Sequence, residues 1–147
     1  MRAVAQRVTR AKVSVEGRVV GAIDLGLVAF VGAQAEDTDA DLDYIARKLV
    51  ELRVFEDERG KMARAVRDVG GGLLLIPQFT LFGDVRRGNR PSFDLAMPPD
   101  AARAAFTRFV ENVRARTTVP VATGVFAADM HVSVENDGPV TILLDSR

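Results

Sequence analysis

The chain has 147 residues, the usual size of one domain, and 48% of them are apolar, enough for a full hydrophobic core. It contains no cysteine, which excludes disulfides, thiolate catalysis and cysteine-ligated metals. Lysine plus arginine (20) balances aspartate plus glutamate (20), so any contact with nucleic acid must be local. The first residues do not form the apolar core of a signal peptide, and no apolar run reaches the ~20 residues of a membrane span. We therefore expect a soluble, cytoplasmic protein.

The N-terminal third is predicted to be rich in strands. Alternating residues from Ala3 to Val8 indicate an opening strand. Residues 12–16 and 18–23 flank Gly17, as in a β-hairpin that turns at this glycine. The run 25–33 is almost entirely apolar, which predicts a strand buried on both faces or a short core element.

Two segments show helical periodicity. Thr38 is a candidate N-cap for a helix from about Ala40 to Arg53. Pro98 and Pro99 favour the start of a second helix that ends near Arg116. Both apolar stripes are expected to face the core.

Further strands are predicted at residues 54–56, 73–76, 119–126, 130–135 and 140–144. The triple glycine at 70–72 lacks the Lys-Ser/Thr of a phosphate-binding loop, so it indicates the start of a strand. The fold class predicted is α+β: one domain over residues 1–147, with a mostly antiparallel, barrel-like sheet and two main helices.

The stretch from Asn136 to Thr141 has two interpretations. Asn136, Asp137 and Gly138 have turn chemistry and lie between two apolar runs, which predicts a tight turn joining two strands. Alternatively, the Gly138–Pro139 bond is cis, which turns two successive carbonyls to the same side. Gly138 would then let another molecule approach its backbone closely. The residues alone leave both interpretations open.

Conventional catalytic groups are scarce. The single histidine, His131, alternates with apolar residues on a predicted strand and is expected to be a partly exposed strand residue. No spacing indicates a carboxylate pair or a histidine metal site, so no metal or cofactor is predicted. An enzyme of this composition would depend on backbone N–H donors, which stabilise an oxyanion by about 100- to 1,000-fold per donor.

Three arginines, Arg86, Arg87 and Arg90, lie together in a predicted loop beside glycine. Such a cluster suits a solvated turn. It also suits a phosphate backbone, because guanidinium groups bind phosphate oxygens bidentately.

Residues 78–81, Gln-Phe-Thr-Leu after an apolar strand, and residues 136–141 together resemble the D-aminoacyl-tRNA deacylase family. Shorter matches at residues 1–8, 53–62, 90–93 and 124–126 extend the resemblance over essentially the whole chain. It implies a cytoplasmic homodimer of α+β fold that acts on the 3′ end of aminoacyl-tRNA. Such enzymes hydrolyse the ester of a D-amino acid, and also remove glycine mischarged onto alanine tRNA.

The resemblance also implies site residues. Gly138 and Pro139 match a Gly-cisPro element that reaches across the dimer interface into the partner's active site. Its carbonyls would hold the substrate's α-amino group and leave no room for an L side chain. Val140, Thr141 and Arg7 are expected to complete the substrate-binding set.

Gln78, Phe79 and Thr80 match the catalytic half, with main-chain N–H groups facing the scissile carbonyl. Either Thr80 is the nucleophile, or the ribose 2′-OH of the terminal adenosine assists a water. We favour the second, because nothing in the sequence pairs with Thr80 as a base. Pro77 stands where the family usually has Ser, as in relatives with looser chiral selectivity, whereas Phe79 and residues 138–141 match the standard branch.

Two rival functions remain at this point. One is a small α+β dimer that binds nucleotides or tRNA ends without turnover. The other is a different esterase that uses Thr80 or Ser92 covalently, which trapping of an acyl-enzyme would reveal.

Overall fold

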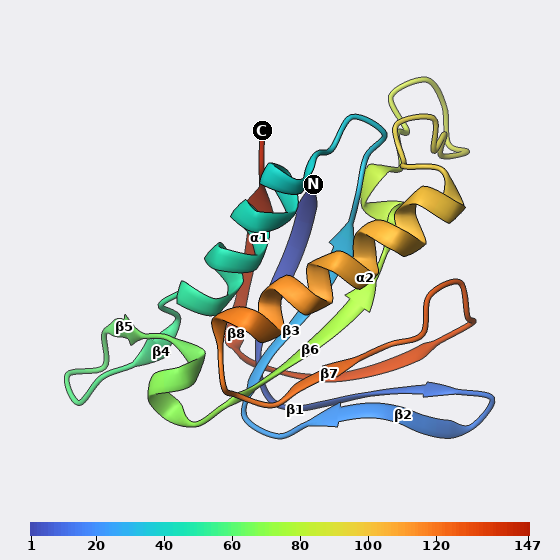
Figure 1. The fold of residues 1–147 in the computed structure, drawn as a ribbon. Coiled ribbons are helices and arrows are strands. Elements are labelled where there is room, and N and C mark those ends of the chain that lie inside the picture. Colours follow the sequence, from blue (N-terminus) through green and yellow to red (C-terminus); the bar gives the residue numbers. More distant parts are fainter.

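Strand β1 (Arg2–Val15) organises the sheet in the computed structural model, which describes residues 1–147 (Figure 1). Along one edge, its first half pairs antiparallel with β3 (Gly26–Gly32) and its second half with β2 (Arg18–Ile23). Along the other edge, β8 (His131–Asp145) runs antiparallel to β1 over nearly its whole length. The prediction of a hairpin that turns at Gly17 is confirmed.

The sheet continues beyond β3 with two parallel pairings, to β6 (Gly72–Pro77) and then β7 (Val121–Thr123). Strand β2 curls back toward β7, where a Cβ added at Gly21 would lie 2.7 Å from the Thr123 carbonyl oxygen. Only glycine fits this close approach, which brings the sheet near to a closed barrel. The α+β, barrel-like architecture predicted from the sequence is thus confirmed.

Helices α1 (Asp39–Glu51) and α2 (Pro99–Arg116) lie side by side over one face of the sheet (Figure 1). The Thr38 N–H donates to Asp41 Oδ2 at 2.8 Å, and this hydrogen bond lowers the pKa of Asp41 to about 2. Both helices begin and end within two residues of their predicted bounds, so these predictions are confirmed. No helix in the structure has the length and apolar character needed to cross a bilayer.

Smaller elements complete the chain. They are the two-stranded sheet of β4 (Phe55–Glu56) and β5 (Met62–Arg64), and the 3₁₀ helices η1 (Val66–Val69) and η2 (Phe79–Phe82). Strand β5 and both 3₁₀ helices were not predicted, since such short elements carry no periodic pattern.

The central strands β3 and β6 are buried on both faces. Leu27, Ala29, Leu73 and Leu75 face the helices, whereas the alternate residues of β3 and β6 enter a second core inside the curled sheet. That second core consists of Val8, Ala11, Val13, Ile23, Val28, Leu74 and Ile76. The near-continuous apolar runs of β3 and β6 follow from this double burial.

Three predictions were wrong. The separate strands predicted at residues 3–8 and 12–16 are one continuous strand, β1. The segments 130–135 and 140–144 are one continuous strand, β8, so Asn136–Gly138 does not reverse the chain. The pairing of β8 with β1 shifts register at Gln6/Val8 and Val8/Arg10, and this bulge accommodates the turn-forming residues within the strand. The predicted strand 119–126 is only Val121–Thr123, followed by a loop in which Ala127 has a left-handed φ of 61°.

Candidate active site

The end of β6 positions the first half of the site. The Gln78 N–H donates to the Val31 carbonyl at 2.7 Å, and a Cβ at Gly32 would lie 2.6 Å from the Gln78 carbonyl oxygen. Helix η2 begins directly afterwards, and its first hydrogen bond runs from the Leu81 N–H to the Gln78 carbonyl. The N–H groups of Phe79 and Thr80 precede this bond and have no partner within the helix. Because the Gln78 N–H is engaged, the candidate oxyanion donors narrow to Phe79 and Thr80.

The Thr80 hydroxyl accepts a hydrogen bond from the side-chain amide of Gln78. A carboxamide is not a base, so this contact orients the hydroxyl without activating it. His131 lies exposed at the start of β8, opposite Ser14, and does not line the cavity described below. Nothing in the structure therefore pairs Thr80 with a proton acceptor.

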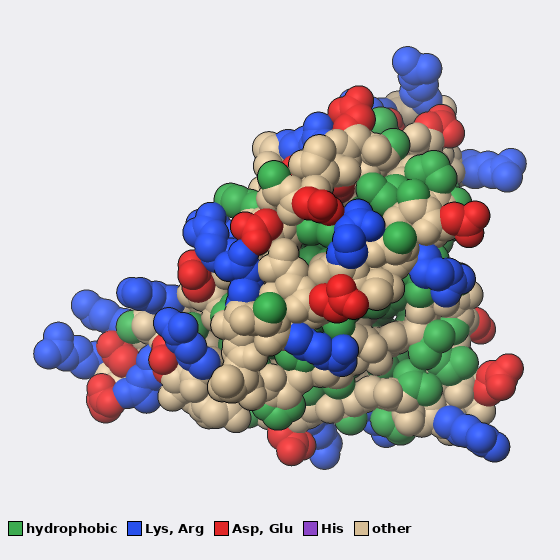
Figure 2. All heavy atoms as spheres, in the orientation of Figure 1, with side chains coloured by type: hydrophobic (Ala, Val, Ile, Leu, Met, Phe, Trp, Pro, Cys, Tyr) green, Lys and Arg blue, Asp and Glu red, His purple; other side chains and the backbone are tan.

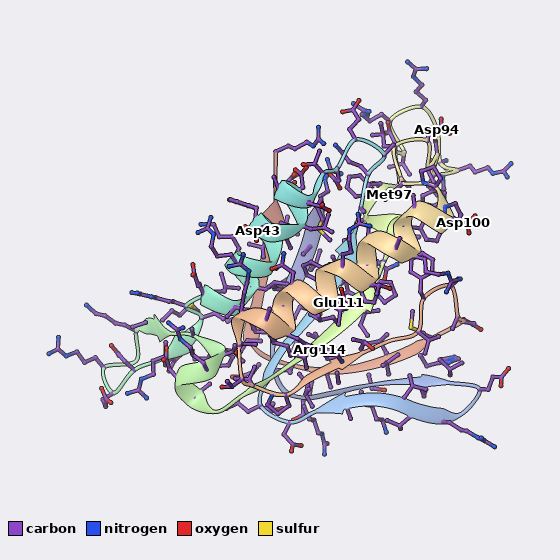
Figure 3. The ribbon with its side chains drawn as sticks, in the orientation of Figure 1. Asp43, Asp94, Met97, Asp100, Glu111 and Arg114 are labelled. Carbon is purple, nitrogen blue, oxygen red and sulfur yellow. The ribbon has the colours of Figure 1, made fainter.

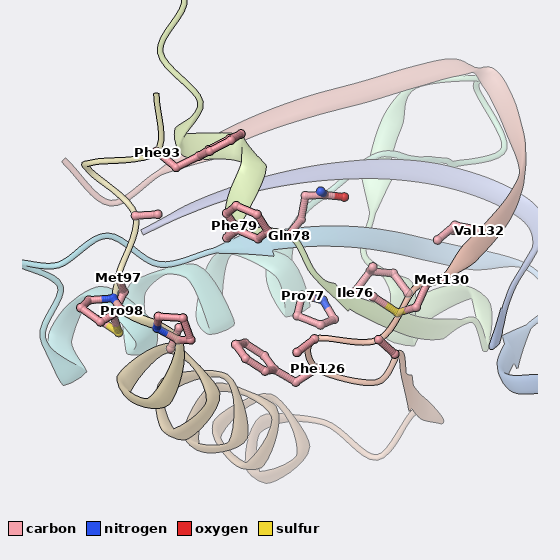
Figure 4. Close-up of a pocket in the computed structure, with 15 residues that line it drawn as sticks. Ile76, Pro77, Gln78, Phe79, Phe93, Met97, Pro98, Phe126, Met130 and Val132 are labelled. Atoms are coloured by element: carbon pink, nitrogen blue, oxygen red, sulfur yellow. The ribbon is translucent and has the colours of Figure 1, made fainter. Parts of the chain in front are cut away.

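A cavity of about 560 Å³ opens beside Gln78 and Phe79 (Figure 4). It lies between the end of β6, the start of α2 and the loop after β7. Eleven of its 15 lining residues are hydrophobic and none carries an ionisable side chain. Phe79 is 56% exposed, and its ring meets that of Phe93 edge to face at 5.0 Å. An apolar cavity with an available aromatic ring suits a flat, unstacked base.

The second half of the site is the bulge in β8. The Gly138–Pro139 bond is cis and Gly138 has a φ of 119°. A Cβ at Gly138 would lie 2.9 Å from Val140 Cγ2 and 3.2 Å from Arg7 Nη2, so no side chain fits there. The cis alternative from the sequence is thereby confirmed, inside a strand instead of at its end.

Arg7 is the one charged residue buried in the chain, at 7% exposure, and it packs against this bulge. Its Nη1 donates to the Val54 carbonyl at 2.7 Å. Its Nε lies 3.1 Å from Asp137 Oδ2, an ion-pair distance, but the geometry does not make a hydrogen bond. The guanidinium thus fills the space behind Gly138 and ties the bulge to the residue before β4.

The amide of Asn136 braces the bulge from within. Its Nδ2 donates to the carbonyls of Arg7 at 2.9 Å and Val140 at 3.1 Å. Gln6 Nε2 donates to Thr141 Oγ1 at 3.2 Å, across the same strand pair. The sequence analysis did not include Gln6 and Asn136 among its candidate residues, because the turn chemistry of Asn136 concealed its role as a cross-strand donor.

The two halves lie far apart within one chain. Register aligns Ala3, Val31 and Pro77 across the sheet, and likewise Arg7, Leu27 and Leu73. The Gly138 bulge therefore lies on β8, which β1 and β3 separate from β6 and Gln78, and none of residues 136–141 lines the cavity.

Comparison with known proteins decides the family. The model described as "D-Tyr-tRNA(Tyr) deacylase" matches residues 4–145. The chain belongs to the D-aminoacyl-tRNA deacylase family. The relative of that name from Sorangium cellulosum (strain So ce56) is 64% identical over 100% of this chain and 98% of its own length. The one from Kosmotoga olearia is 55% identical, again over 100% and 98%.

Two solved structures have the same fold. A protein named "c-Myc DNA Unwinding Element Binding Protein" matches with a TM-score of 0.95 and 44% identity, over 100% of this chain and 99% of that one. A "probable eukaryotic D-amino acid tRNA deacylase" matches with a TM-score of 0.83 over 98% of each chain. At 19% identity, this second likeness is evidence for the fold alone.

The loop that carries Arg86, Arg87 and Arg90, the arginine loop, is exposed next to the cavity. Phe93 follows this loop and lines the cavity. Arg86 pairs with Asp84, with Nε 2.9 Å from Oδ1, and these hydrogen bonds lower the pKa of Asp84 to about 2. Arg87 and Arg90 make no ion pair within the chain. Basic side chains project from this end of the molecule (Figure 2). Arg87 and Arg90 thus remain available to a phosphate, whereas Arg86 is partly neutralised.

Proposed function

We propose that this deacylase hydrolyses the ester between a D-amino acid and the 3′ end of tRNA, releasing free tRNA and the D-amino acid. Glycine mischarged onto alanine tRNA is a second substrate, since it has no side chain to exclude. The observation that carries the proposal is an apolar cavity lined by Gln78 and Phe79, next to which the N–H groups of Phe79 and Thr80 have no partner within helix η2. The names of the relatives support it. We infer a cytoplasmic location, because the aminoacyl-tRNA substrate is used in translation there.

In the reaction, a water attacks the ester carbonyl carbon, and the carbonyl oxygen becomes an oxyanion that accepts from the Phe79 and Thr80 N–H groups. The bond between the carbonyl carbon and the ribose oxygen then breaks, and the ribose oxygen takes up the proton that the attacking water releases. Because no protein base lies beside Thr80, the neighbouring 2′-OH of the substrate orients the attacking water. Preorganised N–H donors of this kind accelerate acyl transfer by about 100- to 1,000-fold each.

Chirality is read by a second copy of the chain. Gly138 and Pro139 of one protomer enter the cavity of its partner, and their carbonyls accept hydrogen bonds from the substrate's α-ammonium group. The bulge then occupies the space that an L side chain needs. The absence of residues 136–141 from the cavity lining of their own chain supports this arrangement, because a single chain then lacks the chiral screen at its own cavity.

The decisive experiment follows ester loss from matched D- and L-aminoacyl-tRNA. We expect rapid hydrolysis of the D form and little action on the L form. Equal rates on both would reject the chiral screen but keep the deacylase. No hydrolysis of either would return the protein to the class of non-catalytic binders.

Subunit mixing tests the shared site. A variant damaged at Gly138 is combined with Phe79→Pro, which removes the Phe79 N–H donor, and each is expected to be inactive alone. Mixed dimers should regain one intact site of two, because one chain supplies the bulge and the other the cavity. Absence of recovery, with subunit exchange verified, would mean that each chain builds its site by itself.

A further inference from the structure

One basic side chain at the edge of the cavity has no protein acceptor. Arg103 follows Ala102, a lining residue, on the first part of α2. Its guanidinium carbon lies 4.8 Å from the centre of the Phe126 ring, and Phe126 also lines the cavity. The guanidinium is therefore fixed against one wall of the cavity by an aromatic face.

The other arginines of α2 are engaged elsewhere. Arg108 Nε lies 3.1 Å from Asp39 Oδ1, and Arg116 pairs with Asp43. Asp39 and Asp43 are both on α1. Arg114, at the far end of the helix from Asp100 (Figure 3), donates to the Val121 carbonyl at 3.2 Å. The side chain of Arg103 makes no ion pair or hydrogen bond, although Asp100 stands one turn before it.

A stacked guanidinium keeps its N–H donors free at the edge of its plane. Phosphate accepts two such donors side by side. A nucleotide whose base enters the apolar cavity must leave its phosphate outside, because no lining residue is charged. The cavity wall formed by Phe126 thus presents a cation where that phosphate emerges.

We propose that Arg103 binds the 5′-phosphate of the terminal nucleotide of the tRNA. This proposal rests on the proposed function, and it adds a substrate-positioning contact on the side of the cavity away from the arginine loop. The contact would hold the base in the cavity while the ester reaches the Phe79 and Thr80 N–H groups.

The test compares two substrates that differ in this phosphate. Wild type and Arg103→Gln act on D-aminoacyl-tRNA and on a D-aminoacyl-adenosine that has no 5′-phosphate. We expect KM for the tRNA to rise about tenfold, the size of one charge-assisted contact, with kcat and the adenosine substrate unchanged. Arg108→Gln, on the same helix but paired with Asp39, is the matched control and should change neither. Equal losses on both substrates would mean that Arg103 acts only by packing on Phe126, and no loss would also overturn the proposal.

Binding keeps the test independent of catalysis. Wild type should bind adenosine 5′-monophosphate about tenfold more tightly than adenosine, and Arg103→Gln should lose this preference. Thermal unfolding of each variant confirms an intact fold. An unchanged preference would reject the phosphate contact even if the deacylase activity stands, whereas a wild type inactive on both substrates would reject the proposed function by itself.

Discussion

The two halves of the site differ in what holds them. At the end of β6, the backbone is fixed by main-chain contacts, such as the Gln78 N–H to Val31, and it opens onto a cavity of about 560 Å³. The bulge of β8 lines no part of that cavity, and side chains hold its backbone, above all the buried Arg7 and the amide of Asn136. One half supplies space and N–H donors, and the other supplies a rigid shape. The catalytic half should therefore tolerate side-chain changes that the bulge does not.

The largest effect is expected at the bulge itself. Gly138→Ala introduces a Cβ 2.9 Å from Val140 Cγ2, at a φ of 119° that L residues rarely adopt. The bulge must shift, and a displacement of about 1 Å costs roughly 100-fold in rate. We expect such a loss of D-aminoacyl-tRNA hydrolysis, measured as kcat/KM. Gly17→Ala is the control, since its φ is also positive but its Cβ would meet nothing within 4 Å; a comparable loss there would point to general strain.

Loss of the Arg7 guanidinium behind the bulge should have the next largest effect. Arg7→Met keeps an unbranched stem but is shorter, so it removes the donor to Val54 and leaves that buried carbonyl unsatisfied. Such a loss costs about 1–3 kcal/mol of the free energy of unfolding. We expect about tenfold lower kcat/KM and a smaller ratio of D to L rates. A chiral ratio equal to wild type, at reduced stability, would show that the bulge holds its shape without Arg7.

The arginine loop should change binding more modestly. Replacing Arg87 and Arg90 with Ala should each flatten the log-log salt dependence of tRNA binding by about 0.7–0.9. Arg86→Ala should change the slope less, because Asp84 already pairs with Arg86. Slopes that stay at the wild-type value for all three variants would make this a solvated loop.

The smallest effect is expected at Thr80, within the catalytic half. Thr80→Ala removes a hydroxyl that only accepts from Gln78, and it keeps the N–H group that the mechanism uses. Hydrolysis within about threefold of wild type is expected, whereas loss of a true nucleophile costs many orders of magnitude. A fall to background in a folded variant would restore Thr80 as nucleophile and reverse the comparison between the halves.

The sequence predicted the helices and the doubly buried strands because their apolar patterns have a clear period. It could not predict that β8 continues through Asn136–Gly138, since turn residues and bulge residues have the same local chemistry. The order of pairing, which places the halves three strands apart, is a tertiary property. The assignment of Gln78, Thr80 and Gly138 came from the family resemblance and not from any pattern in these residues.

The cavity was beyond reach for a related reason. Its walls come from segments that are distant in the chain, around Gln78, Met97 and Phe126, and each segment alone reads as an ordinary loop or helix start. Arg7 was marked only as a substrate-binding residue by resemblance. Its burial, and its role behind the bulge, depend on Val54 and Asp137, which no spacing in the sequence connects to it.

Because no ionisable side chain lines the cavity, the pH dependence of substrate binding has a different source. Between about pH 5 and pH 9, the only group at the reacting centre that titrates is the α-amino group of the substrate, with an ordinary pKa of about 7.7–8.0. In the arrangement that we propose, the Gly138 and Pro139 carbonyls accept hydrogen bonds from this group, so they favour its ammonium form. The affinity should thus fall as the pH rises through the substrate's own pKa, and an ester of a D-2-hydroxy acid should show no such break. The loss of affinity with rising pH would then come from deprotonation of the substrate and not of any group of the enzyme.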